Sequence, residues 1–244
     1  LRQTGDGRVK FVHKVGKIAQ PLTYRRAWRK AMRVLHPLPL APLLAKVDQK
    51  RLGELRAKHL EGAKAYASYR QHYVKYLDVE PHLQMNIHRL QDLGLHRSSP
   101  KDVLDIGCGG GFFLFILQQL GHTGLGLDTN EIPMFTDIVD LLGVKRKIAT
   151  VRAFEPLPDL GRKFDWITGY STAFHGSVGQ SWRWGVPEWT YFLDDLRRHL
   201  KPGGRIFFGL NPAYDGTYYT PEILHLFLAR GAQVERENVL FPPA

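Results

Sequence analysis

The chain has 244 residues and a formal net charge of +11, with 43% hydrophobic and 23% charged residues, as in an ordinary globular protein. Its single cysteine excludes an internal disulfide and a cysteine-based zinc finger, and no apolar run reaches the ~18 residues that a membrane-spanning helix needs. No signal peptide is recognisable, so the expected compartment is the cytoplasm.

The positive charge is concentrated at the N-terminal end. Residues 1–60 carry 15 Lys and Arg against three acidic residues, whereas residues 61–244 carry 19 against 20 and are nearly neutral. We therefore expect a basic, mostly helical N-terminal extension over residues 1–60. The domain follows over residues 61–244, with a helical lid segment at 61–98 and an α/β core at 99–244.

The densest basic stretch, residues 25–33, holds five Lys and Arg. Trp28, Met32 and Leu35 share one face of a helix there, and the prolines at 37, 39 and 42 make a stiff connector after it. Three interpretations remain open. Residues 8–36 bind an anionic membrane surface or an anionic substrate, so that the protein is peripheral to the membrane; they bind nucleic acid, which no recognition motif supports; or the apolar face packs on the domain or on a partner.

Residues 46–94 show helical patterning. Tyrosines at 66, 69, 73 and 76 recur at spacings of three and four, which puts them on one side of a helix. They form either a packing stripe or a lid over a pocket.

From residue 101 onward, short apolar strands alternate with helices, which predicts a parallel sheet with helices on both faces. The expected strands are DVLDI, TGLGLD, Ile148–Val151, Asp165–Thr168, Arg205–Gly209 and Gln233–Leu240. The expected helices are FFLFILQQL, Glu131–Leu142, Pro187–Leu200 and Pro221–Ala229.

A glycine-rich turn follows the first of these strands. Gly107 and Gly109 let the backbone approach a ligand closely, and Asp128 ends the next strand, where a carboxylate accepts hydrogen bonds from ribose hydroxyls. Together they indicate a nucleotide-like cofactor. Phe112 stands where a dinucleotide fingerprint needs its third small residue, so the pattern fits D-x-G-x-G-x-G, the turn of an S-adenosylmethionine (SAM) site, better.

Five motifs in order resemble those of class I SAM-dependent methyltransferases of the small-molecule or glycan type. They are VLDIGCGGG (103–111), GLGLDTN (124–130), KFDWITGYSTAFHG (163–176), LDDLRRHLKPGGRIFFGLNP (193–212) and TPEILHLFLARGAQVE (220–235). The resemblance implies a Rossmann-like, doubly wound, mostly parallel sheet and SAM as the cofactor. It also implies that the family's usual last antiparallel strand is absent or lies beyond Ala244.

The resemblance further implies roles for residues at matching positions. The residues expected to border the methionine end of SAM are Asp105, Gly107, Cys108 and Gly109. Those expected at the ribose, at the adenine edge and near the methyl group are Asp128 with Thr129, Ala153 with Phe154, and Tyr170.

His175 occupies the histidine position after the fourth strand and is the candidate general base, since its ordinary pKa suits proton abstraction near neutral pH. The alternative is a structural role. In the following loop, Trp182 and Trp184 are candidates to stack on an acceptor, and Arg183 to pair with a phosphate or carboxylate; alternatively, these residues only pack the loop down. No metal-ligand spacing is present, so no metal is expected.

The leading hypothesis is O-methylation of a small molecule or glycan, lipid-linked or phosphorylated among the options. The alternatives are methylation of RNA or another macromolecule recruited by the basic N-terminus, and a SAM-binding regulatory protein without turnover. The acceptor, the methylated atom and the oligomeric state do not follow from the sequence.

Overall fold

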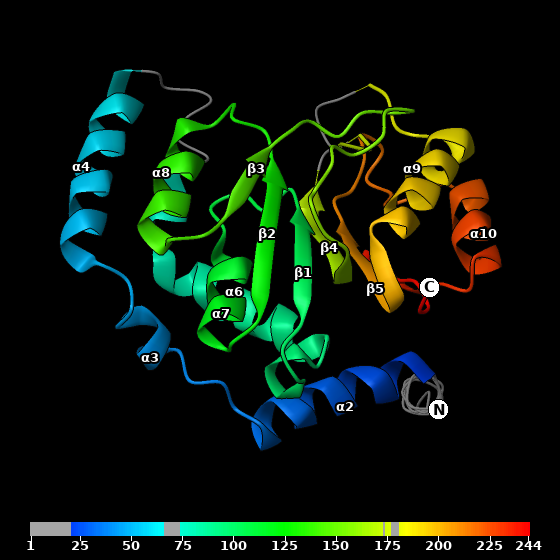
Figure 1. Ribbon diagram of the computed structural model, residues 1–244, viewed down its shortest axis with the longest axis horizontal. Helices are drawn as coiled ribbons and strands as arrows, with labels where there is room; N and C mark the ends of the chain where they lie inside the picture. The colour runs from blue at the N-terminus through cyan, green and yellow to red at the C-terminus, as the bar shows by residue number, and fades with distance from the viewer. Residues whose placement is uncertain (1–20, 66–73, 173, 177–180) are drawn as a thin grey trace, which may run out of the picture.

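The computed structural model describes residues 21–65, 74–172, 174–176 and 181–244, which form an α/β domain around a central sheet (Figure 1). The strands are β1 (Asp102–Ile106), β2 (Thr123–Asp128), β3 (Arg146–Ile148), β4 (Phe164–Thr172), β5 (Leu200–Leu210), β6 (Gln233–Glu235) and β7 (Asn238–Leu240). The α-helices are α2 (Pro21–Leu35), α3 (Ala41–Leu44), α4 (Gln49–Ala65), α6 (Val79–Asp92), α7 (Phe112–Gln119), α8 (Pro133–Leu142), α9 (Val186–Arg198) and α10 (Pro221–Ala229). Two 3-10 turns flank α6: η1 (Lys75–Leu77) and η2 (Leu95–Arg97).

The sheet order is β3-β2-β1-β4-β5-β7-β6, and only β7 runs antiparallel to its neighbours. This is the doubly wound, mostly parallel architecture that the alternating pattern predicts. The strand order reverses between β1 and β4, which is where open α/β sheets form their ligand crevice.

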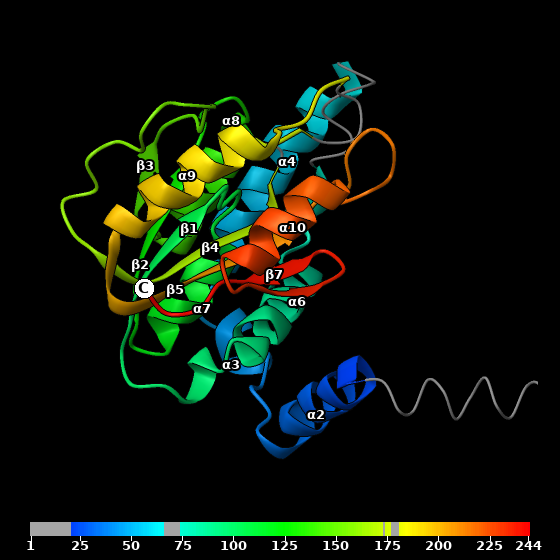
Figure 2. The same ribbon diagram turned by 90° about the vertical axis from the view of Figure 1, so that its right-hand side faces the viewer.

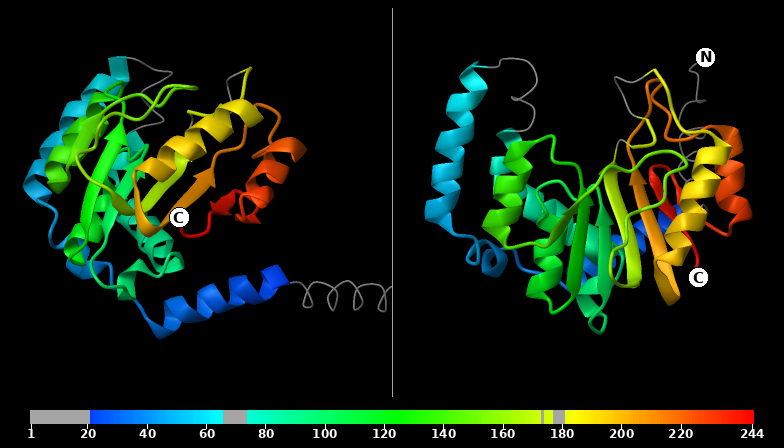
Figure 3. Two further views of the ribbon diagram at one scale, coloured as in Figure 1. Left: turned by 45° about the vertical axis from the view of Figure 1, so that its right-hand side comes forward. Right: turned by 45° about the horizontal axis from the view of Figure 1, so that its top comes forward.

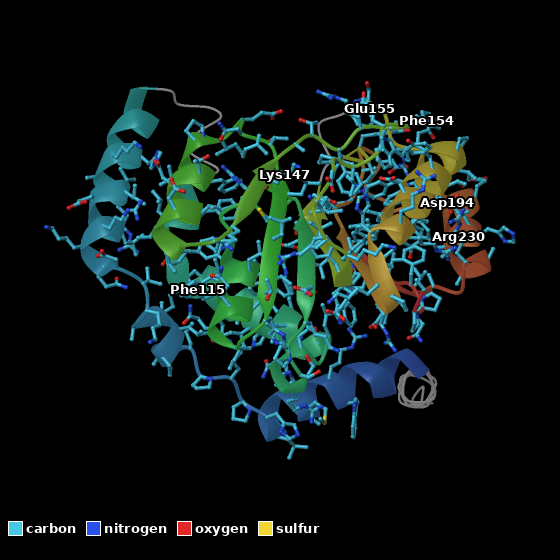
Figure 4. The ribbon with its side chains drawn as sticks, in the orientation of Figure 1. Phe115, Lys147, Phe154, Glu155, Asp194 and Arg230 are labelled. Atoms are coloured by element: carbon cyan, nitrogen blue, oxygen red, sulfur yellow. The ribbon has the colours of Figure 1, made fainter. Side chains whose placement is uncertain are left out.

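Apolar side chains fill two cores, one on each face of the sheet. Val103 of β1 faces the core beneath α6, α7 and α8, whereas Leu104 and Ile106 face the core beneath α9 and α10. The alternation follows from the two-residue period of a strand. Asp194 of α9 and Arg230 at the end of α10 join the outer surfaces of their helices by an ion pair (Figure 4).

The C-terminal segment differs from the expected single strand over Gln233–Leu240. Arg236 has a φ of 52°, which turns the chain and folds the segment into β6 and β7. The last antiparallel strand is therefore β7, and the expectation that it is absent or lies beyond Ala244 is wrong. A turn built from two charged residues, with no glycine in the left-handed position, carries little sequence signal.

The third strand is also shifted from the expected Ile148–Val151. It spans Arg146–Ile148 because these residues pair with Gly126–Asp128, and β2 has ended by the next position. The Ala149 N–H makes the last bond to β2, donating to the Asp128 carbonyl at 2.9 Å, and the chain beyond it lines the cavity at the carboxyl end of the sheet.

The expected boundary at residue 60 falls inside α4. Leu43, Val47, Leu52 and Leu55 are buried in the same core as α6 and α7, so residues 41–60 are part of the domain rather than of an extension. Charge alone does not mark this boundary, because a helix can carry basic residues on one side and core leucines on the other. Of the expected tyrosine stripe, residues 66, 69 and 73 lie outside the described residues.

Helix α2 runs below the sheet, at the margin of the domain (Figures 1 and 2). Arg29 pairs with Glu235 of β6, and Arg33 pairs with Asp92 of α6 at 2.6 Å. Trp28 and Leu35 are both 66% exposed. Packing of this apolar face on the domain is therefore not supported for Trp28 and Leu35, because the basic side of the helix makes the ion pairs. Packing on a partner stays a prediction.

Candidate cofactor and active site

A cavity of about 1190 Å³ lies at the carboxyl ends of β1, β2 and β4, at the point where the strand order reverses. The oblique views show α6 and α7 on one side of the sheet there and α9 on the other (Figure 3). Four segments supply the lining: the glycine turn after β1, the end of β2, the end of β4 and one side of α6.

The glycine turn needs glycine for two separate reasons. Gly107 and Gly109 have φ values of 70° and 52°, in the left-handed region that other residues rarely adopt. A Cβ on Gly107 would also lie 2.8 Å from Thr172 Cγ2, which is too close. The turn therefore exposes bare backbone to the cavity. Cys108, between these glycines, also lines the cavity, and burial raises the pKa of its thiol well above the usual value.

Asp128 ends β2 at the same edge of the cavity. Its carboxylate accepts hydrogen bonds from the backbone N–H of Gly109 at 2.6 Å and of Thr129 at 2.7 Å. Burial raises the pKa of Asp128, and the two N–H donors oppose that shift. Thr129 lines the cavity beside it.

Asp105, on β1, is a buried carboxylic acid in the lining of the cavity. It is in register with Thr168 on the neighbouring strand β4, and the Thr168 hydroxyl donates to its carboxylate at 2.7 Å. Burial raises the pKa of Asp105 to about 7, while the Thr168 hydrogen bond and the Arg89 charge oppose the shift.

Helix α6 contributes a row of polar side chains that the sequence reasoning missed. His82, Asn86 and Arg89 lie at positions i, i+4 and i+7, so they share one side of the helix, and all three line the cavity. The guanidinium of Arg89 donates to Asn86 Oδ1 at 3.2 Å and lies 4.4 Å from the centre of the Tyr170 ring. The i, i+4, i+7 spacing of these polar residues in a predicted helix was the available signal.

The tautomer of His82 follows from its hydrogen bond. Nε2 lies 3.1 Å from the Lys75 carbonyl oxygen, which only accepts, so Nε2 carries the proton and Nδ1 keeps its lone pair. The ring is stacked between Tyr76 and Phe112, with centroids 4.5 and 5.3 Å away. Burial lowers the pKa of His82, so the imidazole is neutral at pH 7.

Residues 104–208 match the family model of a methyltransferase domain. This part of the chain is a methyltransferase domain of the class I SAM-dependent type. A ubiquinone biosynthesis O-methyltransferase of Pseudomonas fluorescens strain SBW25 is 30% identical over 137 residues, which are 54% of this chain and 55% of the relative. The chain thus spans about half the length of the curated relatives it matches.

Solved methyltransferase structures overlap with the domain at lower similarity. The ribosomal protein L11 methylase of Lactobacillus delbrueckii subsp. bulgaricus is 15% identical, with a TM-score of 0.42 over 64% of this chain and 79% of that chain. The SAM-bound amino pentose methyltransferase CalS10 of Micromonospora echinaspora is 25% identical, with a TM-score of 0.38 over 52% and 49%.

The residues around the cavity of this methyltransferase domain fit SAM. Two buried hydroxyls that line it, those of Tyr170 and Thr172, have no hydrogen-bond partner in the part of the chain that the structure describes. Buried polar groups without partners are costly, so their presence indicates a polar ligand. Asp105 and Arg89 supply opposite charges, as the ammonium and carboxylate of an amino-acid tail require.

Of the two residues expected at the adenine edge, only Ala153 lines the cavity. Phe154 is 53% exposed; its ring lies 5.9 Å from that of Tyr191 on α9, and its label marks the upper rim of the domain (Figure 4). Its φ of 59° lies in the left-handed region, and this backbone conformation directs the side chain outward. The expectation that Phe154 borders the cofactor is therefore not supported.

His175 does not line the cavity. It is buried in an aromatic cluster, with ring centroids 5.4 Å from Phe174 and 5.5 Å from Trp189. Burial lowers the pKa of His175 to about 4, and the Arg183 charge acts in the same direction. A group that is enclosed in this way is poorly placed to take a proton from an acceptor, so the geometry favours the structural alternative.

The tryptophans of the loop differ in burial. Trp182 is exposed and lines the cavity. Trp184 is buried against Phe174 and Trp189, but it is also part of the cavity lining. Arg183 is committed within the protein: it pairs with Asp215 and donates to the Thr217 hydroxyl at 2.9 Å. Arg183 therefore joins this loop to the segment after β5 rather than offering a free cation.

A second cavity of about 540 Å³ lies between α2, α6 and the β5-β7-β6 side of the sheet. It shares four lining residues with the cofactor cavity: Arg89, Tyr170, Ser171 and Asn211. Its remaining lining combines apolar and aromatic side chains, among them Phe207 and Leu240, with charged ones, among them Glu235 and Glu237. These four residues thus form the wall between the two spaces.

Proposed function

We propose that this protein transfers a methyl group from SAM to an oxygen atom of a small molecule. The observation that carries the proposal is the polar row of α6, which brings a neutral imidazole and a guanidinium to the same cavity as the glycine turn and Asp128. Cofactor-binding groups and a proton acceptor then share one enclosed space.

The cofactor would be held at its two polar ends. Asp128, at the end of β2, suits the ribose hydroxyls, while Asp105 and Arg89 suit the charged groups of the amino-acid tail. When bound, SAM supplies an electrophilic methyl group on a sulfonium centre. The remaining tasks, which are alignment of the acceptor oxygen and removal of its proton, belong to the protein.

His82 is the candidate proton acceptor, in place of His175. The Lys75 carbonyl holds its Nε2 proton, and the free Nδ1 lone pair can accept a hydroxyl proton. The stacked rings of Tyr76 and Phe112 fix the orientation of the imidazole. A fixed, neutral imidazole within reach of the acceptor is what general base catalysis requires.

An acceptor with an aromatic body and polar substituents suits the mixed lining of the second cavity, whose wall of Arg89, Tyr170, Ser171 and Asn211 adjoins the cofactor cavity. The name of the Pseudomonas relatives, which refers to O-methylation in ubiquinone biosynthesis, agrees with oxygen as the target atom.

Cofactor binding is tested by calorimetric titration with S-adenosylhomocysteine. Asp128→Ala should bind at least about tenfold more weakly than the wild type, because it loses charged hydrogen bonds worth about 1.5–3 kcal/mol each. Asp140→Ala, at an exposed position on α8, is the matched control and should bind as the wild type does. Equal affinity of the Asp128 variant would contradict the assignment.

Turnover is tested with radiolabelled SAM and two probes, a dihydroxybenzoate and an RNA oligonucleotide. We expect label on the phenolic probe, with a rate that falls at least about tenfold in His82→Ala and stays near wild type in His175→Phe. Label on the RNA alone would favour the macromolecular alternative, and an unchanged rate in His82→Ala would remove it as proton acceptor.

A further inference from the structure

The apolar side of helix α2 faces away from the protein. Ala27, Trp28, Ala31, Val34 and Leu35 are all exposed and form an apolar band along one side of the helix, which we call the outer stripe. Val34 is 74% exposed, slightly more than Trp28 and Leu35. Bands of this kind are uncommon on the free surface of a protein unless something covers them.

The basic side of the same helix holds α2 in this orientation. Arg33 makes a two-pronged contact with Asp92, with Nη2 at 2.6 Å from Oδ2 and Nε at 3.1 Å from Oδ1. Arg29 pairs with Glu235 one turn earlier. Both arginines lie on the side of the helix opposite to the outer stripe. Their ion pairs therefore orient the helix so that the apolar residues face outward.

The charge of the segment identifies the chemistry of what covers the stripe. α2 contains five Lys and Arg and no acidic residue. Residues 1–20 add five Lys and Arg against one acidic residue. Lys30, on α2, is exposed. Arg29 and Arg33 are already paired with Glu235 and Asp92 on the other side of the helix, so the exposed Lys30 is the described cation that can face lipid head groups. An apolar stripe with tryptophan beside such a cation is complementary to an anionic lipid surface, where the ring enters the interface.

We propose that α2 docks this protein on an anionic phospholipid surface through the outer stripe. Trp28 lies at the edge of the stripe nearest to Arg29 and also lines the second cavity, so docking would bring that cavity next to the lipid. An acceptor dissolved in the membrane would then have a short path to the wall shared with the cofactor cavity. The docking itself does not depend on the proposed methyl transfer.

The test is co-sedimentation of the full chain with two kinds of vesicle, one of equal parts phosphatidylglycerol and phosphatidylcholine and one of phosphatidylcholine alone. We expect binding to the anionic vesicles and at least about tenfold weaker binding to the neutral ones. Trp28→Ser combined with Leu35→Ser should weaken binding to anionic vesicles by at least about tenfold. Leu228→Ser, at an exposed leucine of α10, is the matched control and should change nothing.

Three results would overturn the proposal: no sedimentation of the wild type with anionic vesicles, equal sedimentation of the stripe variant, or a dimer in light scattering that the stripe variant dissociates while vesicle binding is absent. Titration with S-adenosylhomocysteine checks that the stripe variant is folded. Loss of vesicle binding with retained cofactor affinity supports docking, and failure of turnover with retained vesicle binding affects only the proposed function.

Discussion

Asp105 is a residue whose protonation in the folded protein differs from that in the unfolded chain. Its folded pKa of about 7 lies above the ordinary value of 3.8, so between these values the folded protein keeps a proton that the unfolded chain releases. The free energy of unfolding therefore falls as the pH rises from about 4 to about 7, by on the order of 4 kcal/mol, without cofactor.

Asp105→Asn removes this ionisation, so we expect the variant to be more stable than the wild type at pH 8 and close to it at pH 4.5. The measurement is urea unfolding of both proteins across that range. Cofactor affinity should fall in the variant, since the amide has no charge to offer an ammonium group. A stability difference that does not change with pH would show that the carboxyl is not perturbed.

His175 changes the stability with pH in the opposite direction to Asp105. Its folded pKa of about 4 lies below the ordinary 6.5, so the unfolded chain binds a proton first as the pH falls. The stability present above pH 6.5 is lost on the way down to about pH 4, by on the order of 3 kcal/mol. The two groups act in overlapping pH ranges with opposite signs, so they partly cancel in the wild type.

We expect His175→Phe to become more stable relative to the wild type as the pH falls from 7.5 to 4.5, because phenylalanine suits the cluster around Phe174 and Trp189 and has no proton to bind. Thermal unfolding of both proteins between pH 4.5 and 7.5 measures this difference in stability. The variant should also keep wild-type affinity for S-adenosylhomocysteine. A parallel pH profile in wild type and variant would place the acid sensitivity elsewhere.

At the scale of an element, the closeness of β2 to α7 depends on two glycines. A Cβ on Gly124 would lie 2.8 Å from Leu114 Cδ2, and a Cβ on Gly126 would lie 2.5 Å from Cys108 Sγ. Helix α7 and the glycine turn can approach the sheet closely because β2 has no side chains at these positions.

Gly126→Ala is expected to destabilise the protein by about 1–3 kcal/mol, as overpacking of a tight core does. Gly53→Ala, in the exposed middle of α4, is its counterpart: a Cβ there meets nothing within 4 Å, and we expect a gain of about 0.5–1 kcal/mol from helix propensity. Chemical denaturation of the two variants measures both. If Gly126→Ala were as stable as the wild type, α7 and the glycine turn would be free to shift, which would contradict the tight packing on β2.

At the scale of the whole molecule, α2 is attached by charge rather than by core packing. Both cores lie in the region from Leu43 onward, and the ion pairs of Arg29 and Arg33 are partly exposed. Exposed pairs of this kind contribute about 0–1 kcal/mol each. No helix of the described residues is long and apolar enough to cross a membrane.

Deletion of residues 1–36 should therefore lower the free energy of unfolding by at most about 2 kcal/mol and leave the affinity for S-adenosylhomocysteine within about twofold of wild type. Denaturation and titration of the shortened protein measure these. A protein that fails to fold without this segment would show that α2 belongs to the domain. Removal of the segment lowers the positive charge by 9, since residues 1–36 hold ten Lys and Arg and one Asp.

The sequence by itself predicted the parallel order of the sheet and the group of residues at the carboxyl ends of β1 and β2. The periodicities of strands and helices are local properties that can be read from the sequence. The glycine turn, Asp105 and Asp128 belong to one strand-turn-helix-strand unit, so their spacing in the sequence is also local. These residues lie together in the structure because β1 and β2 are adjacent and parallel. The boundaries of β3 and the β6–β7 turn were missed because they depend on where a partner strand ends and on a turn without glycine.

Only the tertiary structure decided which side chains face the cavity. His175 and Phe154 follow strand ends and satisfy the sequence pattern, yet one is enclosed by aromatic rings and the other turns outward at a positive φ. Arg89 and His82 come from α6, far from any motif, and reach the site through helix packing. The direction of the outer stripe likewise depends on Asp92 and Glu235, partners that lie 59 and 206 residues away from their arginines. Periodicity predicts that a helix has two faces; long-range contacts decide which of them turns inward.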